Sequence, residues 1–369
     1  MSGGVDSSVA AALLAEQGHD VIGLSMQLYD VSEQTDGSRS FGSCCTIDDL
    51  HDARRVAAAI DIPHYILNLE RQFHEQVVSN FVQEYASGRT PLPCAHCNSD
   101  LKFTTLLDRA LGFGADAVAT GHYARVERDA ATGRYMLRRG VDAAKDQSYF
   151  LFSLTQEQLA RAVFPVGDQP KDAVRDYARR RNLPVADKPD SQEICFIPDN
   201  DYASFVAARS PVADPQGVIV NEQGDVVGRH EGVHRFTVGQ RKGLGLSNAA
   251  GSAGSAPVYV LALNAAERQV MVGPKTSLER TTLTASGVNW IIPPPATGLR
   301  ASVQIRHRHR AAPAAVQAIE GESVLSVGSG SAATGRAAVI FDAPQVAVTP
   351  GQAVVFYQDD VVIGGGWID

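Results

Sequence analysis

Hydrophobic and polar positions alternate between helix-like and strand-like patterns through the first half of the chain. Helical spacing of apolar residues predicts four helices: Ser8 to Gln17, Asp48 to Ile60, Phe73 to Tyr85 and Leu101 to Leu111. Short apolar runs predict three strands: Val21 to Leu28, His64 to Leu69 and Ala117 to Thr120. Strands that alternate with helices imply a parallel sheet covered on both faces, so we expect an α/β domain.

The pattern changes near Ile197, where short β-like runs separated by Gly and Pro turns replace the helices. These runs include GVIV, RFTVG, VYVLAL, QVMVG, AAVIF and QAVVFY. Regularly spaced short strands are typical of small β-domains and barrels. We therefore predict three domains: residues 1–200 with the parallel sheet, residues 201–278 as a central β-rich domain, and residues 279–369 as a C-terminal β-barrel.

The length of 369 residues also favours several domains over a single core. No apolar run approaches the roughly 20 residues that cross a bilayer, and the N-terminus lacks the pattern of a signal peptide. We therefore expect no membrane contact and a cytoplasmic location. The net charge of −8 gives no sign of nucleic-acid binding, although a local basic patch would suffice for it.

The N-terminal sequence SGGVDSS opens directly into the first predicted helix. The loop contains Ser2, Gly3, Gly4, Val5, Asp6, Ser7 and Ser8. Its backbone N–H groups and the helix N-terminus would face a bound phosphate, the glycines would permit close approach, and the serines would add hydroxyl donors. Asp6 would hold the loop or orient Mg²⁺.

The same loop lacks the Gly-Lys-Ser/Thr ending that places a lysine on the β- and γ-phosphates of ATP. Without that lysine, the loop favours ATP cleavage that releases pyrophosphate over γ-phosphoryl transfer. The simpler alternative is a Ser/Gly helix cap that binds no ligand.

Two of the five cysteines have the spacing CxxC just before a predicted helix. Cys94 and Cys97 follow a loop with two prolines, and the nearby Lys102 and Arg89 would favour a thiolate. The spacing also suits redox exchange or half of a zinc site, and the residues alone leave these alternatives open. From their surroundings alone, the other cysteines indicate packing: Cys44, Cys45 and Cys195.

Two basic stretches favour either RNA binding or simply solvated surfaces. Residues 306–310, RHRHR, are predicted to form a strand with arginines on one face and histidines on the other. A buried strand would not hold so many charges, so one face would meet water or phosphate. The second stretch is a predicted basic helix containing Lys171, Arg175, Arg179, Arg180 and Arg181.

Several motifs occur together over nearly the whole chain: SGGVDSS, PCAHCN, GHYAR, KDQSYFL, SQEICF, HRFTVGQRKGLGL and TPGQAVVFYQDDVVIGGGWI. In this order they resemble the bacterial tRNA-specific 2-thiouridylases of the ATP-pyrophosphatase (PP-loop) superfamily, which have an adenine nucleotide alpha hydrolase-like core. The resemblance implies ATP-dependent replacement of the 2-oxygen of the wobble uridine by sulfur in tRNAs for Lys, Glu and Gln. The uridine O2 would be adenylated, and a protein persulfide would supply the sulfur.

The resemblance also implies roles for individual residues. Cys97 matches the nucleophile and Cys195 the persulfide-carrying cysteine, and the two would close a transient disulfide as sulfur leaves. Met26 and Gly121 match positions that contact the nucleotide beside the N-terminal loop. The matched tRNA-contacting positions are His122, Lys145, Asp146, Gln147, Arg306, His307 and Gln352. The implied partners are tRNA and a persulfide donor such as a cysteine desulfurase or a sulfur relay protein.

Two features depart from the family pattern. Cys94 stands where many members have an aspartate, and a thiol is a poorer proton acceptor at neutral pH. We interpret Cys94 as an auxiliary residue that resolves a disulfide with Cys97 or joins Cys97 and Cys195 around an iron–sulfur cluster. The family also has an apolar strand before SGGVDSS, and without that strand we expect weaker folding and weaker ATP binding.

Two competing hypotheses remain beside tRNA thiolation. One is a related PP-loop enzyme that adenylates a different substrate. The other is a truncated, catalytically impaired relative that binds tRNA.

Overall fold

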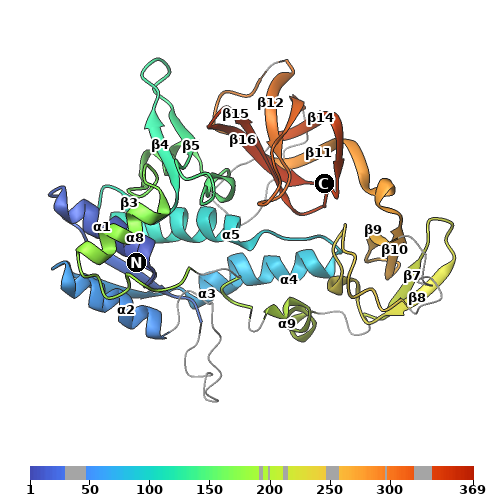
Figure 1. Cartoon of the computed structure of the whole chain (residues 1–369), viewed down its shortest axis with the longest axis horizontal. Coiled ribbons are helices and arrows are strands. Elements are labelled where there is room, and N and C mark those ends of the chain that lie inside the picture. The colour runs from blue at the N-terminus through green and yellow to red at the C-terminus, as the bar shows by residue number, and fades with distance from the viewer. Residues whose placement is uncertain are drawn as a thin grey trace.

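The computed structural model describes residues 1–29, 47–190, 194–197, 200–210, 215–246, 257–295, 297–319 and 335–369. Cys44 and Cys45 lie outside the described residues. Figure 1 shows an α/β part around the N-terminus, a β-barrel that carries the C-terminus, and a smaller sheet to one side of the barrel. The predicted order of an α/β domain followed by two β-rich parts is confirmed.

Two long composite helices follow the first strands of the α/β part. The helices up to residue 112 are α1 (Val5–Glu16), α2 (Ile47–Ala59), α3 (Glu70–Phe73), η2 (His74–Val78), α4 (Ser79–Ala86), α5 (Pro93–His96), η3 (Cys97–Leu106) and α6 (Leu107–Gly112). The segments α3, η2 and α4 are continuous, and so are α5, η3 and α6. The second composite helix begins eight residues before the predicted Leu101, because Pro93 supplies a backbone angle suited to a first helical turn.

The predicted parallel strands are present as two short sheets. Strand β1 (Gly23–Gln27) pairs in parallel with β2 (His64–Asn68), and β3 (Val118–Ala119) pairs in parallel with β6 (Ala162–Val163). Among the described residues these pairs form separate two-stranded sheets. The later elements of this part are β4 (Ala124–Arg128), β5 (Tyr135–Arg139), η4 (Ser148–Phe150), α7 (Gln156–Ala160) and α8 (Lys171–Arg180).

The central region contains one helix and a four-stranded sheet. Helix α9 (Tyr202–Arg209) precedes the strands β7 (Gly217–Val220), β8 (Val226–His230), β9 (Tyr259–Asn264) and β10 (Gln269–Gly273). The strand order is β8-β7-β10-β9, and only the β7–β10 pair is parallel. Buried Ile219, Val260 and Val270 form part of its own small core.

The C-terminal strands close into a barrel. They are β11 (Glu279–Trp290), β12 (Leu299–Gln304), β13 (Ala312–Ile319), β14 (Gly335–Val346), β15 (Ala353–Gln358) and β16 (Val361–Ile368). Their order is β11-β14-β13-β12-β15-β16, and β16 pairs back with β11. Strand β5 pairs with Val361 and Val362 at the start of β16, ahead of the residues that pair with β11, so the β4–β5 hairpin extends the barrel sheet.

The prediction that residues 306–310 form a strand is wrong. They form the connection between β12 and β13, with the amide of His309 donating to the carbonyl of Arg306 at 2.9 Å. Closely spaced charges have no favourable place in the wall of a packed barrel, and a turn leaves them in contact with water.

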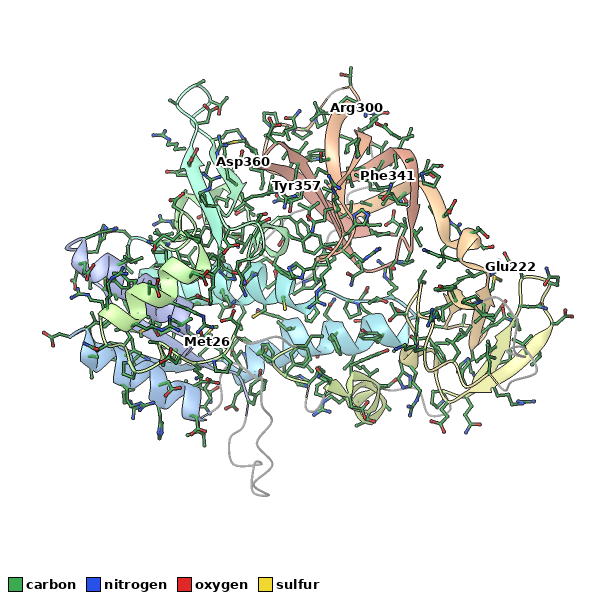
Figure 2. The ribbon with its side chains drawn as sticks, viewed as in Figure 1. Met26, Glu222, Arg300, Phe341, Tyr357 and Asp360 are labelled. Carbon is green, nitrogen blue, oxygen red and sulfur yellow. The ribbon has the colours of Figure 1, made fainter. Side chains whose placement is uncertain are left out.

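A single hydrophobic core joins the α/β part to the barrel. Phe103, Tyr149 and Phe152 pack with Val355 and Tyr357 of β15. The hydroxyl of Tyr149 also donates to the carbonyl of Ala353 at 2.8 Å. Figure 2 labels Tyr357 on the barrel, well away from Met26 on β1. The barrel is therefore not an independent appendage, because its strands complete the core beside the first domain.

Candidate functional site

The N-terminal loop makes a tight turn before α1. Gly3 has a φ of +70°, and a Cβ at this position would lie 2.2 Å from the carbonyl oxygen of Asp49, so the loop requires glycine here. The carbonyl of Gly4 accepts hydrogen bonds from Ser7 Oγ at 3.2 Å and Ser8 Oγ at 2.8 Å. Gly4 has no side chain to cap α1, so the first N–H groups of the helix can meet an anion.

Two other residues matched to nucleotide contact lie beside this loop or on the neighbouring strand. A Cβ on Gly121 would lie 2.5 Å from the backbone of Asp6 and Ser7, so the segment after β3 runs directly against the loop. Met26 lies on β1, and its partly buried side chain packs against the core. Ser2, which is exposed, has its hydroxyl 3.1 Å from that of Ser7.

Asp6 is held by two buried side chains that the sequence analysis did not connect with it. The ammonium of Lys171 donates to both carboxylate oxygens of Asp6, at 2.7 and 2.8 Å. The hydroxyl of Tyr123 donates to the same carboxylate at 2.8 Å. Burial, followed by the negative charge of Asp6, raises the pKa of Tyr123, so its hydroxyl stays protonated and donates. Asp6 therefore serves to fix the loop, and its oxygens already have partners.

Lys171 also connects Asp6 to a second carboxylate. Its ammonium lies 2.8 Å from Asp190, which in addition accepts from Lys145 at 2.8 Å and Arg175 at 2.7 Å. Burial opposes ionisation of Asp190, but the hydrogen bonds from Lys145 and Lys171 outweigh it and lower the pKa to about 2. Asp190 is therefore a stable anion at neutral pH.

Lys188 approaches the loop from another side. Its ammonium donates to the carbonyl of Gly3 at 3.1 Å, to Asp49 at 2.5 Å and to Asp52 at 2.6 Å. Burial alone would lower the pKa of Lys188, but the two carboxylates outweigh it and raise the pKa above its ordinary value. Tyr123 belongs to the GHYAR motif, so motif membership was a signal for it, whereas Lys188 lies just before the SQEICF motif and outside it.

The sequence suggested that the CxxC cysteines lie in a loop before a helix. In the structure both lie within a helix. Cys94 is exposed in α5, and Cys97 is partly buried at the start of η3. Cys195 is also partly buried, and both Cys97 and Cys195 pack against the same hydrophobic cluster around Phe73 and Phe81. The structure therefore places these two cysteines, which are far apart in the sequence, against the same cluster.

Helix α5 and the loop before it are held against the barrel. The ring of His96 stacks on Trp367 with centroids 4.6 Å apart. Arg89 donates to the carbonyl of Ile368 at 3.0 Å, and Gln352 donates to the carbonyl of Thr90 at 3.0 Å. The amide of Gln352, a predicted tRNA contact, thus lies within the protein, where it orients the loop that leads to Cys94.

His122 follows β3, close to the N-terminal loop. Its Nδ1 lies 2.7 Å from Thr120 Oγ1, and its ring meets Phe164 edge-on with centroids 6.0 Å apart. Burial, followed by the charge of Lys102, lowers the pKa of His122 well below its usual range. His122 is therefore a neutral imidazole at physiological pH. Lys102 lies on η3, in the same composite helix as Cys97.

The KDQ turn is an internally bonded structure. The carboxylate of Asp146 accepts from Arg139 at 2.7 Å and from the amides of Gly140 and Ser148, both at 3.1 Å. Only 7% of the Asp146 side chain is exposed. Gln147 accepts a hydrogen bond from the amide of Tyr123 at 3.0 Å, which connects the turn to the segment beside the N-terminal loop.

The KDQ turn, the cysteine helix and the barrel turn meet around Phe150. Asn98, the residue after Cys97, donates to the carbonyl of Phe150 at 3.1 Å. The ring of His307 lies 4.5 Å from that of Phe150, between centroids. His307 is exposed and Arg306 is partly exposed, although the guanidinium of Arg306 donates to the carbonyl of Val346 at 3.1 Å. Two predicted tRNA contacts thus lie near the predicted nucleophile.

The interpretation of α8 as a basic RNA-binding face is weakened by its ion pairs. Lys171 is buried and Arg175 bonds to Asp190, as described above. Arg179 pairs with Asp176 at 3.2 Å and with Asp187 at 3.1 Å. Arg181 pairs with Glu16 of α1. These charges hold α8 to its neighbours, because acidic residues of the surrounding segments neutralise them.

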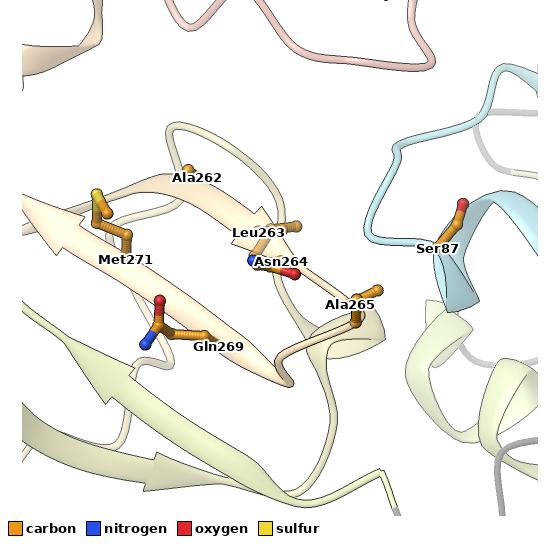
Figure 3. Close-up of a pocket in the computed structure, with 8 residues that line it drawn as sticks. Ser87, Ala262, Leu263, Asn264, Ala265, Gln269 and Met271 are labelled. Atoms are coloured by element: carbon orange, nitrogen blue, oxygen red, sulfur yellow. The ribbon is translucent and has the colours of Figure 1, made fainter. Parts of the chain in front are cut away.

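The part of the chain that the structure describes contains no group of three or more His, Cys, Asp or Glu side chains arranged to hold a metal ion. Within the same residues, no helix is long and apolar enough to span a bilayer. A surface pocket of about 640 Å³ lies between Ser87 at the end of α4 and the β9–β10 hairpin (Figure 3). Its lining includes Leu263, Asn264 and Met271, and neither the loop nor the cysteines border it.

Models of known protein families match three consecutive segments. Residues 1–199 match the tRNA methyl transferase HUP domain, residues 203–274 the tRNA methyl transferase PRC-barrel domain, and residues 280–368 the aminomethyltransferase β-barrel domain.

Close relatives match over the full length of the chain. The tRNA-specific 2-thiouridylase MnmA of Geotalea uraniireducens is 50% identical over 370 residues, covering 100% of this chain and 93% of that protein. The enzymes of the same name from Solibacter usitatus and Magnetococcus marinus are 50% and 48% identical, covering 100% of this chain and 98% and 97% of those proteins. With its N-terminal loop, its cysteines and its barrel all within these matches, the chain belongs to the family of tRNA-specific 2-thiouridylases.

Proposed function

We propose that this protein is a tRNA-uridine 2-sulfurtransferase that uses ATP to activate the wobble uridine of tRNAs for Lys, Glu and Gln. The observation that carries the proposal is the packing of Cys97 and Cys195 against one hydrophobic cluster. A methyl transferase would have no need for two thiols held in this way. The thiols and the ATP-type loop together favour activation followed by sulfur transfer.

ATP binds with its phosphates on the loop Ser2–Ser8 and its nucleoside beside Met26 and Gly121. The N–H groups at the start of α1 receive the phosphates, and Asp6 keeps the loop in place through Lys171 and Tyr123. The uridine O2 attacks the α-phosphorus and pyrophosphate leaves, which converts O2 into a leaving group. If Mg²⁺ accompanies ATP, it binds chiefly through the phosphates, because both oxygens of Asp6 already have partners.

Sulfur then passes from Cys195 to the activated base. The terminal sulfur of a Cys195 persulfide bonds to C2, and AMP departs with the former O2. The Cys97 thiolate attacks Sγ of Cys195 and breaks its bond to the transferred sulfur, whose electron pair remains on the thiocarbonyl. A Cys97–Cys195 disulfide is left, and a reductant restores both thiols. Neutral His122 lies close enough to the loop to hydrogen-bond a uracil edge without placing a charge against it.

The tRNA is bound across the junction of the α/β part and the barrel. Arg306 and His307 lie on an exposed turn next to Phe150, where they can meet phosphate or a splayed base. Lys145, the first residue of the KDQ turn, is partly exposed and also donates to Asp190 at 2.8 Å. Asp146, Gln147 and Gln352 shape this surface through bonds inside the protein. Domain limits at residues 200 and 278 place the catalytic residues in the first domain and the basic turn in the last.

The remaining partners follow from the chemistry. A cysteine desulfurase or a sulfur relay protein loads Cys195, and the need for tRNA and ATP places the reaction in the cytoplasm. Cys94 has an auxiliary role next to Cys97, and no step is assigned to an iron–sulfur cluster.

The test is to incubate the protein with ATP, a persulfide source and unmodified tRNA, and to measure 2-thiouridine by mass spectrometry. Cys97→Ala and Cys195→Ala are each expected to abolish the product. Product that persists in either variant would refute the paired-thiol mechanism. Product absent from the wild type would refute the function itself.

A further inference from the structure

The last strand of the barrel lies against the helix that carries Cys97. Trp367, near the end of β16, stacks its indole on the imidazole of His96, with an angle of 2° between the rings and their centroids 4.6 Å apart. His96 comes directly before Cys97 in the composite helix of α5, η3 and α6. One aromatic contact therefore connects the C-terminal barrel to the residue next to the predicted nucleophile.

The indole of Trp367 is held by the protein on its other sides. It meets the buried ring of Phe152 at an angle of 71°, with centroids 5.5 Å apart. A Cβ on Gly287 of β11 would lie 3.2 Å from Cδ1 of the indole, so the neighbouring strand runs close to its edge. The backbone of Trp367 pairs with Ser286 of β11 and with Ala353 of β15. The indole is therefore a fixed part of the barrel.

The residues on both sides of Cys97 are held, while Cys97 itself is only partly buried. The Nδ1 of His96 lies 3.1 Å from the carboxylate of Asp100, one turn further along the helix. Asn98 donates to the carbonyl of Phe150 at 3.1 Å. The direction of a side chain in a helix follows from its backbone. The contacts at positions 96 and 98 therefore set the direction in which the thiol of Cys97 points.

We infer that Trp367 is a positioning residue for Cys97, acting through the stacked ring of His96. The inference rests on the proposed function, because it takes Cys97 to be the nucleophile that releases sulfur from Cys195. Such an attack needs the reacting atoms aligned and about 3–3.5 Å apart, so a small displacement of the helix slows it steeply. The stack keeps the first turns of the helix against the barrel, and the barrel thereby contributes to sulfur transfer as well as to tRNA binding.

The first experiment measures single-turnover formation of 2-thiouridine by persulfide-loaded protein at saturating ATP and several tRNA concentrations. Trp367→Leu removes the flat ring, and the rate at saturating tRNA is expected to fall about tenfold, with the half-saturating tRNA concentration changed less than about twofold. Trp367→Phe keeps an aromatic face for His96 and is expected to recover most of the rate. A change in the half-saturating concentration alone would assign Trp367 to tRNA binding and refute the inference.

Trp290→Leu is the matched control, because Trp290 is the other tryptophan of the chain and also belongs to the barrel. It packs against Phe356, with centroids 5.6 Å apart, in the barrel's own core. With the folded fraction of each variant checked by thermal melting, the control is expected to keep the wild-type rate at saturating tRNA. An equal loss of rate in Trp290→Leu and Trp367→Leu would reveal only a general effect of barrel stability and would contradict the proposed positioning.

A second variant keeps the test decisive if Trp367→Leu folds poorly. His96→Leu leaves the indole in place, removes the ring stacked on it, and is expected to lose about tenfold in rate as well. If the two rings act as one unit, the double variant loses no more than about tenfold, whereas independent effects would multiply to about a hundredfold. Multiplied losses, or an unchanged rate in His96→Leu, would exclude a route through His96.

Alkylation by iodoacetamide adds a measurement that requires neither tRNA nor ATP. Cys94 is exposed on the same helix and serves as the internal reference for the partly buried Cys97. Without the stack the helix opens locally more often, so the rate at Cys97 relative to Cys94, measured by tandem mass spectrometry, is expected to rise about threefold or more in Trp367→Leu and His96→Leu. A wild type that makes no 2-thiouridine would refute the proposed function, whereas an unchanged alkylation ratio in both variants would overturn the positioning.

Discussion

Lys171 supplies the strongest test of how the N-terminal loop is held, since one ammonium group joins Asp6 to Asp190. Lys171→Met keeps the length of the side chain and removes its charge. Only 8% of the Lys171 side chain is exposed, compared with 31% for Asp6 and 26% for Asp190. Removing one partner of a fully buried ion pair costs about 3–5 kcal/mol.

The expected cost here is smaller than that limit. Asp6 keeps its bond from Tyr123, Asp190 keeps Lys145 and Arg175, and both carboxylates retain some contact with water. We therefore expect a loss of about 2–3 kcal/mol in the free energy of unfolding. For a domain of this size that corresponds to a fall in Tm of roughly 5–10 °C. The KM for ATP should rise about tenfold, equivalent to about 1.4 kcal/mol, because Asp6 no longer fixes the loop.

The assay combines thermal melting, nucleotide titration and initial rates of 2-thiouridine formation. Arg179→Gln is the matched control on the same helix, because its ion pairs with Asp176 and Asp187 are exposed to solvent and contribute little to stability. If Lys171→Met melts and binds ATP like Arg179→Gln, the buried pair does not support the loop and the reasoning is refuted.

Three other substitutions address separate parts of the structure. Gly3→Ala should reduce nucleotide affinity at least about tenfold, because its Cβ would lie 2.2 Å from the carbonyl of Asp49 at a positive φ; unchanged binding by calorimetry would contradict this loop geometry. Asp190→Asn should make the free energy of unfolding depend less on pH in acid. The pKa of Asp190 in the folded protein, about 2, lies below the ordinary 3.8. The ionised carboxylate therefore stabilises the wild type above about pH 4, and this stabilisation is lost between pH 4 and 2. Urea unfolding at several pH values measures this dependence. The same fall in the free energy of unfolding between pH 4 and 2 in both proteins would contradict the prediction. Gly365→Ala should loosen the barrel, because its Cβ would lie 2.7 Å from the ring of Phe152; a melting temperature within about 1 °C of the wild type would show that this contact relaxes at little cost.

Local patterns were enough to predict the kind of element in most places. The apolar spacing of α2 gave its limits within a residue, since Asp48 to Ile60 was expected and Ile47–Ala59 is observed. The start of the cysteine helix was missed because proline was interpreted as loop-forming, although Pro93 occupies a first-turn position. The turn at residues 306–310 was taken for a strand because alternation of residue types alone does not distinguish a strand from a charged connection.

The sequence was enough to predict which chemical groups form the candidate site, but not which side chains contact one another there. Motifs identified the loop, the cysteines and the KDQ turn, but the contacts of Asp6 with Tyr123 and Lys171 join residues separated by 117 and 165 positions. Such pairings depend on how the tertiary fold brings segments together. A basic helix pattern is the same whether its charges meet RNA, water or carboxylates, so neither interpretation left open for Lys171 anticipated its pairing with Asp6 and Asp190.

These pairings also bear on how a protein with a net charge of −8 can bind RNA. Lys171, Arg175 and Arg179 of α8 are paired with acidic residues of the protein, which reduces the attraction of that helix for phosphate. The turn at residues 306–310 is different: it carries three arginines, and both Arg308 and Arg310 are exposed. Each phosphate contact makes the logarithm of the binding constant fall more steeply with the logarithm of the salt concentration. An RNA held mainly by this turn should make about 2–3 such contacts and therefore show a shallow slope. Replacing Arg308 and Arg310 by Gln should lower the slope measured by filter binding by about 2, whereas a slope that stays the same would place the RNA elsewhere on the protein.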